Sequence, residues 1–200
     1  MDNRILYPAL SGRQIILASQ SPRRKQLLEW AEVPFSVRVI ATDESFPAEL
    51  EVSKVPIHIA RQKALAVQAQ LPTGSNPIII AADTIVVAGG EIIGKPISAE
   101  HAFSILSQLS GATHQVITGV VILGREEVSF ADITTVMFHP LDEAEIRYYI
   151  DRYQPYDKAG AYGIQEWIGV TGIRSINGDF YNVMGLPVSR VIQALKSDKV

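Results

Sequence analysis

The run PIIIAADTIVV, residues 77–87, restricts the fold more than any other segment of the chain. It is apolar apart from Asp83 and Thr84 and rich in β-branched residues, so it predicts a buried strand. The pair Gly89-Gly90 then predicts a turn into a short returning strand. The chain must therefore bury a long strand that carries a carboxylate.

The elements on either side of this strand indicate the fold class. Helices and strands alternate in the first half, and antiparallel strand pairs follow, which predicts an α/β fold built on a mixed sheet with flanking helices. The Asn-Gly pair at 177–178 predicts a hairpin. Further strands are expected at 14–18, 35–40, 114–123 and 126–138, and helices at 22–31, 55–71, 98–109, 142–151 and from Pro187 onward. Three of these helices have start signals: Ser21 as N-cap before Pro22, Ser98 as N-cap, and Asp142 with Glu145 as a capping box.

Length and composition limit the classes of function. The 200 residues suffice for one domain, expected over 1–200 with 1–13 as an N-terminal extension. The net charge of −3 argues against broad affinity for nucleic acid or anionic membranes. Cysteine is absent, and no segment reaches the length of about 18 apolar residues that a membrane span needs. We expect a cytoplasmic protein.

The segment ILASQSPRRKQLLEW, residues 16–30, places Arg23, Arg24 and Lys25 at a predicted helix start. Each cation there is disfavoured by about 0.3–1 kcal/mol, because a helix N-terminus is itself partly positive. A bound polyphosphate would reverse that sign, and Ser19 and Ser21 add hydroxyl donors. The alternative is a solvated basic turn whose arginines pair with surface carboxylates.

Asp83 is a second candidate, because an ionised carboxylate inside an apolar run needs a cation, a metal or a shifted pKa. The alternative is a local turn or bulge at Asp83 and Thr84. Asp43 and Glu44 become metal ligands only if Asp83 lies close to them; otherwise they belong to a solvated loop. The four histidines show no spacing typical of metal ligands.

Two lysines are weaker candidates. The spacing of a phosphate-binding P-loop is matched by Gly89, Gly94 and Lys95. We reject this motif, because Pro96 follows Lys95 and no helix begins there. Lys95 remains a candidate for an isolated phosphate contact. Lys63 and Arg61 flank an apolar helix stripe, where such residues usually extend their charges to solvent from the edge of a core.

The segment YDKAGAYGIQ, residues 156–165, is too rich in small residues for an ordinary helix. It fits a binding loop lined by backbone, in which Gln165 offers a donor and an acceptor to a base edge. A purely structural turn is the alternative.

Taken together, these stretches resemble the Maf-family nucleoside triphosphate pyrophosphatases, in order and over nearly the whole chain. AGAYGIQ is similar to the subgroup that acts on dTTP and UTP. The matching stretches are ILASQSPRRKQLL, DE at 43–44, ARQKA at 60–64, AADTIV at 81–86, GKP at 94–96, LSGATHQVITGV at 109–120, DKAGAYGIQ at 157–165 and INGDFYNVMGLP at 176–187.

The resemblance implies hydrolysis between the α- and β-phosphates, with Asp83 as proton acceptor. It further implies a fold like that of inosine triphosphate pyrophosphatases, elongated and two-lobed with a central cleft, and a homodimer. It also implies that Arg23, Thr84 and Gln165 bear on substrate choice. From the chemistry of the reaction we assign the triphosphate to Ser19, Ser21, Arg23 and Arg24, with Lys63 and Lys95 as further catalytic cations. Thr84 and Gln165 are assigned to the base, and Glu44 with Asp83 to Mg²⁺ or Mn²⁺. The alternatives are the same reaction on other nucleotides such as 7-methyl-GTP, or a non-catalytic nucleotide-binding regulator of cell division.

Overall fold

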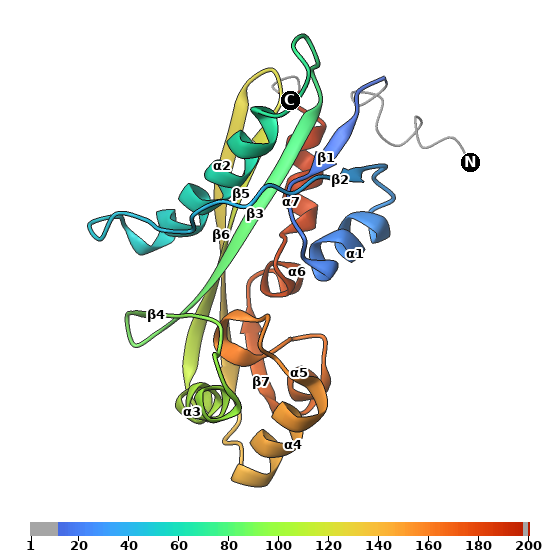
Figure 1. Cartoon of the computed structure of the whole chain (residues 1–200). Coiled ribbons are helices and arrows are strands. Elements are labelled where there is room, and N and C mark those ends of the chain that lie inside the picture. Colours follow the sequence, from blue (N-terminus) through green and yellow to red (C-terminus); the bar gives the residue numbers. More distant parts are fainter. Residues whose placement is uncertain (1–11, 198–199) are drawn as a thin grey trace. The chain divides into compact units, whose positions relative to one another are not determined.

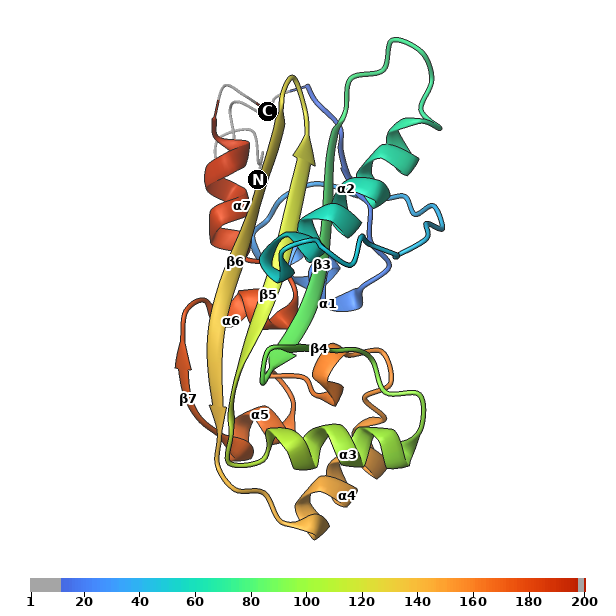
Figure 2. The ribbon, with the colours of Figure 1, turned by 90° about the vertical axis from the view of Figure 1, so that its left-hand side faces the viewer.

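The structure is a computed structural model that describes residues 12–197 and residue 200. The expected extension at 1–13 therefore lies almost wholly outside the described residues. Figures 1 and 2 show the ribbon from two directions. In chain order the elements are β1 (Ile15–Leu17), α1 (Pro22–Trp30), β2 (Ser36–Val37), η3 (Val52–Lys54), α2 (Val55–Gln68), β3 (Ile78–Ala88), β4 (Glu91–Ile93), α3 (Ala99–Leu109), β5 (Thr113–Leu123), β6 (Glu127–Phe138), α4 (Glu143–Tyr153), η4 (Ala159–Ala161), α5 (Trp167–Gly172), β7 (Ile173–Asn177), α6 (Phe180–Met184) and α7 (Val188–Leu195).

The described strands form one seven-stranded sheet in the order β2-β1-β3-β5-β6-β7, with β4 paired to β3. Strand β1 runs parallel to β2 and to β3, with Ile16 opposite Ser36 and Ile79. The pairs β3–β4 and β6–β7 are antiparallel. The predicted mixed sheet with flanking helices is confirmed, and β3 is the predicted buried strand.

The chain divides into two compact units. Unit 1 comprises the described residues of Met1–Asp83, Thr118–Ala131 and Gly185–Val200, and unit 2 comprises Thr84–Ile117 and Asp132–Met184. We describe each unit by itself. The prediction of a single domain, and of a cleft between two lobes, stays a prediction.

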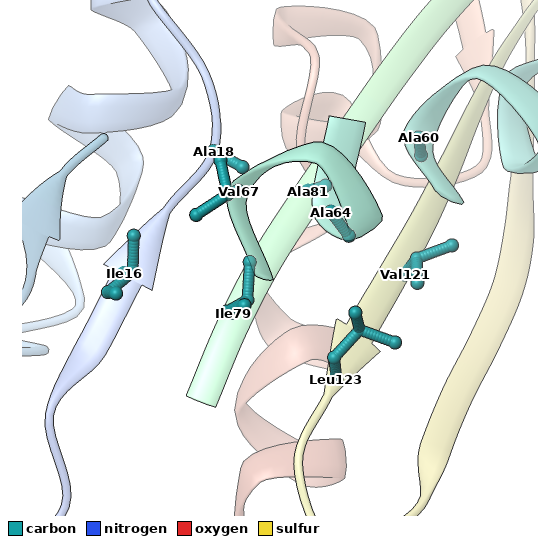
Figure 3. Close-up of a cluster of buried hydrophobic side chains, with 9 residues drawn as sticks. All are labelled: Ile16, Ala18, Ala60, Ala64, Val67, Ile79, Ala81, Val121 and Leu123. Atoms are coloured by element: carbon teal, nitrogen blue, oxygen red, sulfur yellow. The ribbon is translucent and has the colours of Figure 1, made fainter. Parts of the chain in front are cut away.

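The core of unit 1 lies between α2 and the sheet (Figure 3). Ala60, Ala64 and Val67 form the buried stripe of α2, at the helical spacing expected from the sequence. They pack on side chains of β1, β3 and β5 and on Ala18, which directly follows β1; the short alanines allow the helix to approach the sheet closely. These partners are Ile16, Ala18, Ile79, Ala81, Val121 and Leu123.

Gly119 of β5 sets how closely α2 approaches. A Cβ added at Gly119 would lie 2.2 Å from the backbone nitrogen of Ile57 and 2.3 Å from the carbonyl carbon of Pro56. Neither atom is the end of a flexible side chain, so only glycine fits here without moving the first turn of α2. The height of α2 above the sheet, and with it the position of every side chain on α2, depends on this glycine.

In unit 2, α3 and α4 pack side by side (Figure 2). Both begin with the caps expected from the sequence. Ser98 accepts a hydrogen bond from the amide of His101, and Asp142 with Glu145 forms a capping box. The guanidinium of Arg147 lies 4.5 Å from the centroid of the Phe103 ring, which joins the two helices.

The predicted hairpin at Asn177-Gly178 is wrong. Strand β7 ends at Asn177, and α6 starts three residues later. The carboxylate of Asp179 accepts a hydrogen bond from the amide of Tyr181 at 2.8 Å, which supports a helix start in place of a returning strand. The strand predicted at 35–40 is also shorter, at two residues, and both of these side chains are exposed.

Among the described residues, none of the helices has both the length and the apolar character required to cross a membrane.

Candidate functional site

The turn between β1 and α1 is built around two serines. Ser21 is the N-cap of α1 and Pro22 follows it, as the sequence predicts. The Ser21 hydroxyl accepts from the amide of Arg24 at 3.4 Å, and the Ser19 hydroxyl accepts from the amide of Ser21 at 3.2 Å. Ser19 is buried, so the first turn of α1 is held against the end of β1.

Arg24 lies in the first turn of α1, and its partly buried side chain bonds back to the chain. Its Nε donates to the carbonyl of Gly185 at 2.7 Å, and its Nη1 donates to the Ser19 hydroxyl at 3.1 Å. Burial lowers the pKa of the Arg24 guanidinium below its ordinary value; the carboxylates of Asp83 and Glu44 raise it, and the charge of Arg23 lowers it further. The guanidinium remains charged, because arginine does not lose its proton in proteins.

Lys63 joins two carboxylates from different parts of unit 1. Its Nζ lies 2.7 Å from Asp83 Oδ1 in β3 and 2.7 Å from Glu44 Oε1 in the loop after β2. The Lys63 and Asp83 side chains are 17% and 15% exposed, whereas that of Glu44 is 53% exposed. Asp83 therefore has the cation that a carboxylate in an apolar strand requires, and that cation is Lys63.

The neighbouring acid Asp43 has a different role. Its two carboxylate oxygens accept from the amide and the hydroxyl of Ser45, at 3.0 and 2.9 Å, and close a local turn. Of the pair at 43–44, only Glu44 has a contact with Lys63.

Asp83 and Glu44 are oxygen donors that already share one cation, the Lys63 ammonium. This donor set fits Mg²⁺ or Mn²⁺ in type, because Mg²⁺ is commonly bound by one or two carboxylates together with waters and substrate phosphates. Within the described residues there is no group of three His, Cys, Asp or Glu that could hold a metal ion. Phosphate oxygens or waters would have to complete the coordination.

In unit 2 the structure brings three of the sequence motifs together. The amide of Gly160 donates to the carbonyl of Gly94 at 3.2 Å, and a Cβ added at Gly160 would lie 2.9 Å from a methyl carbon of Val86. The segment 157–165 thus packs on the strand that follows Asp83 and on the GKP turn. Thr84 is half-buried in β3, and Lys95 and Gln165 are exposed.

Tyr162 fixes the middle of that segment. Its hydroxyl lies 2.7 Å from Nε2 of His114, and both side chains are buried beside the ring of Phe138. Burial lowers the pKa of His114 to about 4, so the imidazole is neutral at neutral pH. The contact anchors the loop, and nothing here links it to chemistry.

The predicted site residues thus fall into two sets. Ser19, Ser21, Arg23, Arg24, Glu44, Lys63 and Asp83 belong to unit 1, and Thr84, Lys95 and Gln165 belong to unit 2. The close approach at Gly119 and the contact of Arg24 with Gly185 were missed from the sequence. Gly119 and Gly185 lie in stretches that were quoted for the family resemblance. That resemblance was the only sequence signal that could have pointed to these two contacts.

Comparison with known proteins gives a consistent result. A family model described as Maf-like protein matches residues 14–198. A dTTP/UTP pyrophosphatase of Cytophaga hutchinsonii is 53% identical over 188 residues, which cover 94% of this chain and 85% of that protein. Proteins of the same name from Bacteroides fragilis and Parabacteroides distasonis are 48% and 49% identical, each over 94% of this chain and 97% of the relative.

A solved structure, described as a nucleoside-triphosphatase/dITP/XTP pyrophosphatase from Mycobacterium abscessus, matches with a TM-score of 0.37 and 14% sequence identity. The match covers 64% of this chain and 75% of that one, and is too distant to define the fold.

Proposed function

Because the chain belongs to the family of Maf-like proteins, we propose that it is a nucleoside triphosphate pyrophosphatase that hydrolyses dTTP and UTP. The products are the nucleoside monophosphate and pyrophosphate. The observation that carries this proposal is the cluster of Lys63, Asp83 and Glu44, whose carboxylates act electrostatically on Arg24 in the first turn of α1. Cleavage of a phosphoanhydride needs positive charge for the phosphates and a carboxylate for the attacking water, and the basic helix start and these carboxylates offer both.

The triphosphate is assigned to the turn between β1 and α1. Backbone amides at the start of a helix point outward toward an anion, and the serine hydroxyls and arginines there are donors suited to phosphate oxygens. The four residues in this role are Ser19, Ser21, Arg23 and Arg24. The bonds that Arg24 makes to Gly185 and Ser19 keep its guanidinium in place before substrate arrives, which lowers the cost of ordering it.

Asp83 is assigned as the general base. An ionised carboxylate accepts the proton of a water molecule as the water oxygen bonds to the α-phosphorus. The bond from the α-phosphorus to the bridging oxygen breaks, and pyrophosphate leaves with the electron pair of that bond. Lys63 holds the Asp83 carboxylate at a fixed position and adds positive charge near the phosphates.

Glu44 and Asp83 would hold Mg²⁺ or Mn²⁺, as their donor chemistry allows. Bound there, the ion would neutralise phosphate charge and make a coordinated water more acidic. In unit 2, Lys95 is assigned as a further phosphate contact, and Thr84 and Gln165 as contacts of the base. As part of the same proposal, the protein is a cytoplasmic homodimer and binds neither nucleic acid nor membranes.

The test is pyrophosphate release from UTP, dTTP, CTP, GTP and 7-methyl-GTP, measured with and without Mg²⁺ or Mn²⁺. We expect metal-dependent release, fastest with dTTP or UTP. Release that is fastest with 7-methyl-GTP would keep the reaction and overturn the substrate assignment. Binding without release from any nucleotide would favour a non-catalytic regulator.

The variant Asp83→Asn tests the base. We expect kcat to fall by about 10²–10⁴-fold, the usual contribution of general-base catalysis, while nucleotide binding persists. Asp151→Asn is the matched control, because it makes the same change on the exposed side of α4. Turnover by Asp83→Asn at the rate of the control would remove Asp83 from this role.

A further inference from the structure

Gln165 occupies an unusual position in unit 2. It is exposed, although the four residues before it, 161–164, are buried. The amide of Glu166 donates to the carbonyl of Gly163 at 3.0 Å, so residues 163–166 form a closed turn with Gln165 near its tip. Among residues 163–166, Gln165 is the exposed residue.

A buried lysine braces the turn from one side. The Lys158 side chain is 9% exposed, and its Nζ lies 2.8 Å from Asp157 Oδ1 and 3.2 Å from Glu166 Oε1. An ammonium that is this deeply buried is tolerated only when carboxylates compensate it. The bond to Glu166 therefore ties the start of the segment to the residue directly after Gln165.

A tyrosine hydroxyl braces the turn from the other side. Tyr149 of α4 is fully buried, and its hydroxyl donates to Glu166 Oε2 while it accepts from the amide of Gly163 at 3.0 Å. One hydroxyl thus holds both ends of the turn. A Cβ added at Gly163 would lie 2.7 Å from Glu166 Cδ, so the absence of a side chain there makes room for this carboxylate.

We propose that Tyr149, Glu166 and Lys158 are positioning residues that fix the Gln165 amide for the recognition of the pyrimidine edge. This inference rests on the proposed function, because it takes Gln165 as the contact of the base. None of the three is proposed to touch substrate. Their contacts hold the backbone on both sides of Gln165, so they determine where its amide donor and acceptor lie.

This arrangement should affect selectivity more than the hydrolysis itself. A site that is built to match donors and acceptors rejects a ligand with the wrong pattern of donors and acceptors, provided that its own groups are held in place. If the turn is free to move, the Gln165 amide can adapt to the donors and acceptors of either base, and the discrimination between the two bases falls. UTP and CTP are the suitable pair, since they share the ribose and the triphosphate and differ at the base edge.

The experiment compares kcat/KM for UTP and CTP in the wild type, Tyr149→Phe and Tyr148→Phe. Tyr149→Phe removes the hydroxyl and keeps the ring. Tyr148→Phe makes the same change at the adjacent, half-exposed position of α4 and keeps the ring contact with Trp167. We expect the UTP-to-CTP ratio to fall about tenfold in Tyr149→Phe, equivalent to about 1.4 kcal/mol, and to stay unchanged in Tyr148→Phe.

A double-mutant cycle separates positioning from general structural damage. If Tyr149 acts through Gln165, then adding Tyr149→Phe to Gln165→Ala leaves the UTP-to-CTP ratio of Gln165→Ala unchanged. Independent, additive losses from the two changes would overturn the proposal. An unaltered ratio in a folded Tyr149→Phe protein would do the same.

Should Tyr149→Phe fail to fold, Glu166→Gln replaces it in the same cycle. The amide keeps the size of the side chain and an acceptor for Tyr149 but loses the charge that pairs with Lys158. The two proposals fail in different ways. A wild type that releases no pyrophosphate overturns the proposed function, whereas an active, selective wild type with equally selective variants overturns only this inference.

Discussion

The guanidinium of Arg24 donates from Nε to the carbonyl of Gly185 at 2.7 Å, across 161 positions of sequence. The same side chain holds the Ser19 hydroxyl, so it joins the start of α1, the end of β1 and the turn before α7. Arg24 is thus a structural residue of unit 1 as well as an assigned phosphate ligand.

Arg24→Lys should therefore lower both stability and activity. A lysine cannot reproduce two donors in a planar fork, and a hydrogen bond from a charged group contributes about 1.5–3 kcal/mol. We expect a loss of about that size in urea unfolding, together with a higher KM for nucleotide. The control is Lys25→Gln in the same turn of the helix. The exposed ion pair of Lys25 with Glu29, at 3.8 Å, should contribute less than about 0.5 kcal/mol. Equal stabilities of the two variants would contradict this.

Gly119→Ala should destabilise unit 1 through the position of α2. The new methyl would meet the backbone at Ile57, and overpacking of this kind costs about 1–3 kcal/mol or more. Because Lys63 lies on the same helix, activity should fall as well. Thermal unfolding measures the first effect and pyrophosphate release the second.

Gly94→Ala is the matched control for stability. A Cβ at Gly94 would have no heavy atom within 4 Å, and its φ is not in the left-handed region. An equal loss of Tm in both variants would show that the close approach at Gly119 is not the cause.

Lys63→Met should leave the mostly buried Asp83 carboxylate without its ammonium partner. We expect a loss of about 1–3 kcal/mol in the free energy of unfolding, because a charge-assisted hydrogen bond is removed and its partner stays desolvated. Lys54→Met is the control, since its pair with Glu51 is exposed on both sides and should contribute less than about 1 kcal/mol. Similar losses in both variants would argue that Asp83 is well solvated.

Stability should decrease between pH 6.5 and about pH 4 because of His114. Burial lowers the pKa of His114 from 6.5 to about 4 in the folded chain, so in that interval the unfolded chain binds a proton that the folded chain does not. The stabilisation is complete above pH 6.5 and is lost as the pH falls, by about 3 kcal/mol in all. Urea unfolding at a series of pH values measures it.

His114→Phe should flatten this part of the pH profile, although the unpaired Tyr162 hydroxyl will lower stability throughout. His139→Phe, which makes the same change at an exposed position, is the matched control. A slope that survives in His114→Phe would assign it to carboxylates instead.

Local structure could be predicted well because its causes lie within a few residues. The serine cap and Pro22 of α1, the cap at Ser98 and the capping box at Asp142 were all predicted from the sequence and are confirmed. One exception is the strand expected at 35–40, of which only Ser36–Val37 forms. Another is Asn177-Gly178, where a strong hairpin signal gives way to a helix start supported by Asp179. The preference of a dipeptide for a turn does not determine what the next residues do.

The sequence by itself determined the five longer helices and most of the strands, the basic turn at Arg23 and Arg24, and the need of Asp83 for a cation, a metal or a shifted pKa. Only the tertiary structure decided which cation that is. Lys63 lies 20 positions from Asp83, and from the sequence alone it resembled a residue at the edge of a core. The bonds of Tyr149 to Glu166 and Gly163, from α4 to a separate loop, were equally invisible. Caps and periodicity act between near neighbours in the chain, whereas these contacts exist only after the sheet has brought distant segments together.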